Sequence, residues 1–69
     1  MIEVFKTNIT QKQKANSIAE ELLQKIPGAK INFDLTDCDN ILRIDCGADI
    51  IQMVTEHLHN RGFQCEVLE

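Results

Sequence analysis

A helical stripe of apolar residues dominates the first half of the chain. These residues recur at steps of three, one, three, one and three positions: Ala15, Ile18, Ala19, Leu22, Leu23 and Ile26. This spacing predicts an amphipathic helix that lies on a core. Thr10 and Gln13 have the spacing of a capping box, which predicts that the helix begins there. Pro27 cannot extend the helix and Gly28 favours a turn, so the predicted helix ends at about Ile26.

Alternation of apolar and polar residues predicts four β-strands. Residues 2–7 alternate with period two and form the first predicted strand. The segments 31–35 and 42–46 also alternate, and the loop between them, 36–40, is rich in Asp and Asn. Such a loop is typical of a β-hairpin, because these side chains cap turns. A shorter alternation over 64–67 predicts the last strand.

A second helix is predicted between the hairpin and the last strand. Helical spacing returns in Ile50, Ile51, Val54 and Leu58. Asp49 stands near the predicted start, where a carboxylate complements the helix dipole. The helix is expected to run to about Arg61. Gly62 is then placed to adopt the left-handed conformation that ends many helices, and Phe63 to supply the hydrophobic contact that follows it.

The order β-α-β-β-α-β predicts an α+β fold of the ferredoxin-like type. Right-handed crossovers give one antiparallel sheet in the order 4-1-3-2, with both helices on one face. The alternation predicts the strand residues that face the helices: Ile2, Val4, Ile31, Phe33, Leu35, Leu42, Ile44, Cys65 and Val67. The polar alternates are expected to face water. Phe5, Ile41 and Leu68 are apolar exceptions on that outer face.

Composition and charge narrow the class of protein. A chain of 69 residues with 43% apolar content is expected to form one domain over residues 1–69, of marginal stability without a partner. The net charge of −4 and the scattered Lys and Arg residues argue against nucleic acid as a partner. No apolar run approaches the ~20 residues that cross a membrane, and no signal-type stretch follows Met1, so a cytoplasmic location is expected.

Two segments resemble the heavy-metal-associated domain family. The sequence IPGAKINFDL at 26–35 is similar to the helix-to-strand passage of these domains, and GFQCEVL at 62–68 to their last turn and strand. In that family a Cys-x-x-Cys pair before the first helix binds copper(I) or zinc. Counted back from Pro27, the two ligand positions fall on Lys12 and Ala15, which cannot coordinate metal. The resemblance therefore implies the fold without a metal at the family site.

The remaining candidates for chemistry are expected at one end of the sheet. The topology gathers there the loop after the first strand, the hairpin tip and the end of the second helix, with Lys12, Asp37, Cys38, Asp39, His59 and Arg61. Soft-metal or thiol chemistry there needs Cys38 as a thiolate and His59 as a second ligand. The alternative is that Cys38 is a tolerated turn residue and that the charged residues cap the hairpin and the helix.

The other histidine and the other two cysteines have simpler interpretations. His57 and His59 are two positions apart and diverge on a helix, so they do not form a joint ligand pair and a solvated surface is expected for them. Cys46 and Cys65 occupy predicted inward strand positions, where a free thiol behaves as a small hydrophobe. Three cysteines without close spacing favour free thiols in a reducing compartment.

The sequence leaves three hypotheses for function. It has no nucleophile elbow, P-loop or dinucleotide fingerprint, so it predicts neither an enzyme nor a cofactor. The first hypothesis is a small interaction or regulatory module that meets a protein partner, or itself, through the sheet face around Phe5, Ile41 and Leu68 or through an edge strand. The second is a soft-metal carrier, for copper or zinc, using Cys38 and His59. The third is a small-molecule sensor similar to ACT domains.

Overall fold

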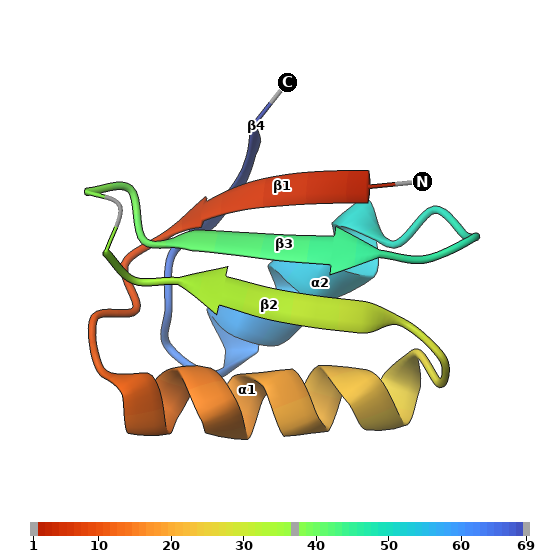
Figure 1. The fold of residues 1–69 in the computed structure, drawn as a ribbon, viewed down its shortest axis with the longest axis horizontal. Coiled ribbons are helices and arrows are strands. Elements are labelled where there is room, and N and C mark those ends of the chain that lie inside the picture. Colours follow the sequence, from red (N-terminus) through yellow and green to blue (C-terminus); the bar gives the residue numbers. More distant parts are fainter. Residues whose placement is uncertain (1, 37, 69) are drawn as a thin grey trace.

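Four strands and two helices follow one another in the order β-α-β-β-α-β. The computed structural model describes residues 2–36 and 38–68. The elements are β1 (Ile2–Thr7), α1 (Lys12–Lys25), β2 (Lys30–Asp34), β3 (Ile41–Asp45), α2 (Ile51–Asn60) and β4 (Cys65–Leu68). The strands form one sheet in the order β2-β3-β1-β4, with every neighbouring pair antiparallel (Figure 1). This is the predicted α+β ferredoxin-like sandwich, and its order is 4-1-3-2 read from the other end.

Helix α1 begins later than the sequence predicts. Its N-cap is Gln11, which has an extended backbone and makes no side-chain cap, so the capping box expected at Thr10 and Gln13 does not form. The physical reason lies just before the helix. Ile9 is buried in the core and donates its backbone N–H to the hydroxyl of Thr7 at 3.2 Å. The chain is therefore still crossing from the sheet to the helix layer at Ile9, and helical geometry follows only after it.

The ends of both helices otherwise agree with the sequence pattern. Ile26 is the C-cap of α1, and Gly28 follows in the left-handed region with a φ of 86°. At the end of α2, Gly62 has a φ of 88°, and the N–H of Phe63 bonds to the carbonyl of Leu58 at 2.9 Å. This arrangement turns the chain back toward the sheet and brings Phe63 against the core, as predicted.

The strand parity predicted for β1 is wrong. The β1–β3 register places Phe5 opposite Leu42, and the β1–β4 register places it opposite Val67, so Phe5 shares the face that the helices cover. Its side chain is 0% exposed, whereas Ile2 is 58% exposed. Both faces of β1 carry apolar residues, so the alternation alone does not select one. The larger ring takes the core, and Ile2 and Val4 lie on the outer face instead.

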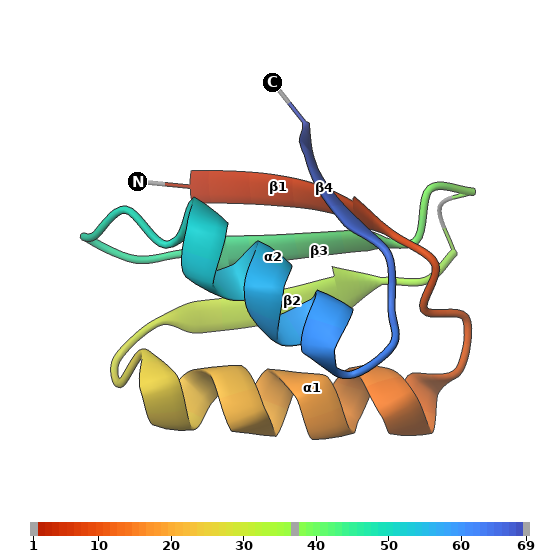
Figure 2. The ribbon, with the colours of Figure 1, turned by 180° about the vertical axis from the view of Figure 1, so that it is seen from behind.

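The core lies between the sheet and the two helices. Figure 2 shows α2 in front of the sheet and α1 running alongside β2. The cluster of buried apolar residues comprises Phe5, Ile9, Ala15, Ile18, Leu22, Ile26, Ala29, Leu42, Ile44, Ile50, Val54, Leu58 and Cys65. Among the described residues, no helix is both long and apolar enough to cross a membrane.

Candidate functional site

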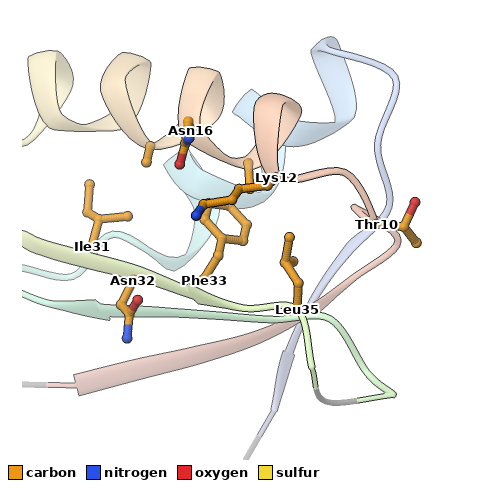
Figure 3. A pocket seen from close by; sticks show the side chains of 9 residues that line it. Thr10, Lys12, Asn16, Ile31, Asn32, Phe33 and Leu35 are labelled. Carbon is orange, nitrogen blue, oxygen red and sulfur yellow. The ribbon is translucent and has the colours of Figure 1, made fainter.

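A groove lies between α1 and β2. It has a volume of about 520 Å³, within the range usual for ligand-binding pockets in proteins. Its lining comes from the loop before α1, the first half of α1 and the length of β2 (Figure 3): Thr10, Lys12, Ala15, Asn16, Ala19, Ile31, Asn32, Phe33 and Leu35. The groove therefore joins one helix face to one strand.

Small helix residues create the space, and strand residues give it an apolar floor. Figure 3 shows Ile31 and Phe33 of β2, and Leu35 just after the strand, pointing toward α1, and all three are only partly buried. On the helix side, Ala15 and Ala19 are too small to fill the gap. The larger apolar residues of α1, such as Ile18 and Leu22, are buried in the core instead. The result is partly exposed hydrophobic surface that no side chain of the described chain covers completely.

The strand that lines the groove is at an edge of the sheet. In the part of the sheet that the structure describes, β2 pairs with β3 alone. Alternate residues of an antiparallel edge strand direct their backbone N–H and C=O groups away from the sheet, where they are ready to pair with another strand. The groove therefore combines apolar side-chain contacts with an open line of backbone hydrogen-bonding groups.

Lys12 is the one charged residue in the lining of this groove. Figure 3 shows its side chain reaching across the groove toward Phe33. No described residue makes an ion pair with Lys12, and the first turn of α1 contains no acidic residue. A cation in the first turn opposes the helix dipole, which usually costs about 0.3 to 1 kcal/mol. The groove is thus locally electropositive on a chain whose net charge is −4.

The structure brings together only part of the cluster predicted at the loop end. Asp39 does reach the end of β1: its carbonyl accepts the N–H of Thr7 at 3.2 Å, and its carboxylate lies 3.7 Å from the ammonium of Lys6. The hydroxyl of Thr7 also donates to the carbonyl of Asn40 at 2.7 Å. Asp37 lies outside the described residues. Lys12 belongs to the groove instead, and Arg61 belongs to an ion-pair cluster between the helices.

The proposed metal ligands Cys38 and His59 are both exposed. His59 borders a smaller depression of about 270 Å³ beside the end of β1, and Cys38 is not part of its lining. No hydrogen bond or ion pair joins the two side chains in the described structure, and residues 2–36 and 38–68 contain no group of three or more His, Cys, Asp or Glu suited to a metal ion. Metal binding through this pair remains a prediction from the sequence.

An ion-pair cluster between the two helices was not predicted. His57 Nε2 lies 2.7 Å from Oε1 of Glu21, and Arg61 Nε donates to both oxygens of that carboxylate, at 3.1 and 3.3 Å. The Arg61 hydrogen bond lowers the pKa of Glu21; partial burial opposes this, and the bond from His57 adds to it. The His57 side chain is only 11% exposed, so its expected place on a solvated surface is wrong. The available signal was the spacing of His57 and Arg61, which are four residues apart and share a helix face.

The three cysteines have different environments, and all are free thiols. Cys65 is 7% exposed, and burial raises the pKa of its thiol to about 11, against a smaller opposing effect of a hydrogen bond from Thr55. This confirms its predicted role in the core. Cys46 is half-buried and lies beyond the end of β3, where its thiol donates to the carbonyl of Ala48 at 3.3 Å. It therefore lies outside the strand, but it packs against the core as its predicted role requires. Cys38 is exposed.

The outer sheet face differs from the interaction surface predicted at Phe5, Ile41 and Leu68. Phe5 is excluded, because it is fully buried on the opposite face. Ile41 is on the outer face but is nearly covered, whereas Leu68 is 41% exposed and lies directly opposite Val4. Ile2 and Val4 lie toward the start of β1 on the same outer face as Leu68, whereas Ile41 pairs with Lys6 further along the strand. The predicted surface is therefore not assembled as one continuous set of side chains.

No family model, no curated protein and no solved structure matches this chain. The resemblance to heavy-metal-associated domains therefore remains a prediction. Both positions on which that family's ligands would fall, Lys12 and Ala15, line the groove and carry no metal-binding atom. The geometry of the groove and the open strand edge is the strongest guide to function that the molecule offers.

Proposed function

We propose that this protein is a small, non-catalytic interaction module that binds an extended segment of a partner protein along the free edge of β2. The observation that carries the proposal is the coincidence of the α1–β2 groove with that edge. An extended segment laid beside β2 adds a strand to the sheet. It gains main-chain hydrogen bonds from β2 and places alternate side chains in the groove.

The dimensions of the site suit such a segment. β2 has five residues, so an added strand pairs over about that length. The apolar floor formed by Ile31, Phe33 and Leu35 follows the same two-residue repeat as the side chains of an extended peptide. Each side chain of the added strand that faces the groove therefore meets a hydrophobic residue of β2 or the gap left by Ala15 and Ala19.

Two further properties support a module that acts through a partner. A 69-residue domain buries only about 60% of the surface that its unfolded chain exposes, so a ligand that binds the folded state adds useful stability. Three free thiols favour a reducing, cytoplasmic setting for the interaction. The resemblance to heavy-metal-associated domains fits a ferredoxin-like scaffold that works here without the family's thiolate pair.

A library of linear peptides displayed on phage and panned against the purified protein tests this function. Binders are then titrated into the ¹⁵N-labelled protein. We expect shifts of the amide signals in β2 and the first half of α1. Shifts confined to the outer sheet face, or a failure to select any peptide, would contradict the proposal. Sedimentation at several concentrations shows whether a second copy occupies the same edge.

A matched pair of variants locates the site. Ala19→Phe fills the groove, whereas Leu23→Phe adds a ring to the same helix one turn further along, at an exposed position outside the groove lining. Ala19→Phe is expected to weaken the binding of selected peptides by at least about tenfold, because the ring occupies the space of a ligand side chain. Leu23→Phe is expected to leave binding unchanged. Equal effects of the two variants would place the peptide elsewhere.

A further inference from the structure

The charge of the groove points to the chemistry of its occupant. Lys12 opposes the dipole of α1, pairs with no described acidic residue and lies across an apolar floor. We propose that the groove selects extended partner segments that carry an acidic side chain two positions from an apolar one. The inference rests on the proposed function and adds to it the identity of the recognised segment.

The spacing follows from the geometry of an added strand. Successive side chains of a strand point to opposite sides, so residues two apart face the groove together. One of them packs on the floor formed by Ile31 and Phe33, and the other comes within reach of the Lys12 ammonium group. A carboxylate suits the second position, because it pairs with Lys12 without leaving a buried charge unmatched.

Asn16 adds a neutral hydrogen-bonding group to the site. Its amide lines the groove on the α1 side and is available to a bound segment beside the Lys12 ammonium group.

The overall negative charge of the chain does not cancel this local effect. The net charge is −4, which on its own favours a basic partner. At physiological ionic strength, however, interactions beyond about 8 Å are largely screened. Among the residues that line the groove, Lys12 alone is charged. Recognition within the groove is therefore set by Lys12, and the acidic surface acts mainly on the rate of approach.

Parallel selections with the wild type and a charge-reversed variant test the inference. The same peptide library is panned against the wild type, against Lys12→Glu, and against Lys14→Glu. Lys14 is in the same helical turn, so the control makes the same change in charge near the same helix end. It lies outside the groove lining, with its ammonium 5.9 Å from the centroid of the Phe63 ring. The wild type and Lys14→Glu are expected to enrich Asp or Glu two positions from an apolar residue, and Lys12→Glu to enrich Lys or Arg there.

Titrations then give the size of the effect. A selected peptide is made with Glu, Gln or Lys at the acidic position and measured against all three proteins. The Lys12→Glu variant is expected to bind the Glu peptide about tenfold more weakly than the wild type does. It is expected to bind the Lys peptide more tightly than the wild type does. In 1 M salt the three peptides should converge, because screening removes the charge-dependent part.

The outcomes separate the two proposals. If the wild type selects neutral or basic peptides that Ala19→Phe still blocks, the interaction function stands and the acidic preference is wrong. An unchanged charge preference in Lys12→Glu overturns the inference in the same way. If no peptide binds the wild type at all, the proposed function fails and the inference fails with it.

Discussion

Glu21 on α1 and His57 on α2 are joined by a 2.7 Å contact between their side chains, and Arg61 completes the link from the next turn of α2. The three residues link the two helices through side-chain contacts. Because the pKa of Glu21 is lowered in the folded state, this link makes folding depend on pH.

The stabilisation from Glu21 should be lost in acid. Its folded pKa lies below the ordinary value of 4.5, so its contribution is fully present above pH 4.5 and disappears as the pH falls through the folded pKa. Glu21→Gln is therefore expected to be less stable than the wild type at pH 7, with the difference shrinking below pH 4.5. Urea unfolding at pH 7 and at pH 3 measures the difference in unfolding free energy between the two proteins. A deficit that is the same at pH 7 and pH 3 would contradict the account.

The corrected parity of β1 predicts which of its apolar residues support the fold. Phe5→Leu shortens a fully buried side chain and should cost more than about 1 kcal/mol of unfolding free energy, through lost contacts and a residual cavity. Ile2→Ala removes an exposed side chain and should stay within about 0.5 kcal/mol of the wild type. Equilibrium denaturation of the two variants measures both losses. A larger loss in Ile2→Ala than in Phe5→Leu would mean that Ile2, as the sequence predicted, faces the core.

Cys65 predicts a loss of stability in alkali. Its thiol has a raised pKa of about 11 in the folded state, against 9.0 as its ordinary value, so above pH 9 the unfolded chain ionises first. The wild type should therefore lose about 1.4 kcal/mol between pH 8 and pH 10 from this group. Cys65→Ala lacks the thiol, so its unfolding free energy should fall by about 1.4 kcal/mol less over the same pH range. Denaturation of both proteins at pH 8 and pH 10 measures this difference. Identical losses would mean that Cys65 is not held in the buried environment described here.

Lys12→Glu is expected to stabilise the protein. It replaces a cation in the first turn of α1 with an anion that complements the helix dipole, a change worth about 1 kcal/mol at low salt. Lys25→Glu makes the same change in the last turn of α1, at the negative end of the helix dipole, and should destabilise the fold. Thermal melts in low salt compare the variants. A lower melting temperature for Lys12→Glu would show that Lys12 supports the fold rather than a ligand.

The sequence predicted the features of the fold that depend on local patterns. The first helix and the helix end at Gly62 appear where their spacing placed them, because each is set by residues close in the chain. Within the stripe from Ala15 to Ile26, however, Leu23 is exposed rather than on the core. The face of β1 was beyond such reasoning, since Ile2 and Phe5 are both apolar and only pairing with β3 and β4 distinguishes them. The start of α1 likewise depended on the burial of Ile9.

The candidate site was harder to predict, because it consists of space between elements distant in sequence. Ala15 and Ala19 were counted as part of an apolar stripe, and nothing local shows that their small size leaves a groove beside β2. The contact of Glu21 with His57 spans 36 residues and depends on how the helices pack. An edge strand was among the surfaces proposed from sequence, but the choice of β2 required the groove.

The central claim is that a partner segment extends the sheet along β2, and amide hydrogen exchange tests it most directly. Exchange is measured for each amide of β2 in the free protein and in its complex with a selected peptide. The account predicts that every second amide of β2, those directed away from β3, becomes protected in the complex while the amides of β4 are unchanged. If the peptide is bound and exchange in β2 stays as it is in the free protein, the segment does not add a strand there.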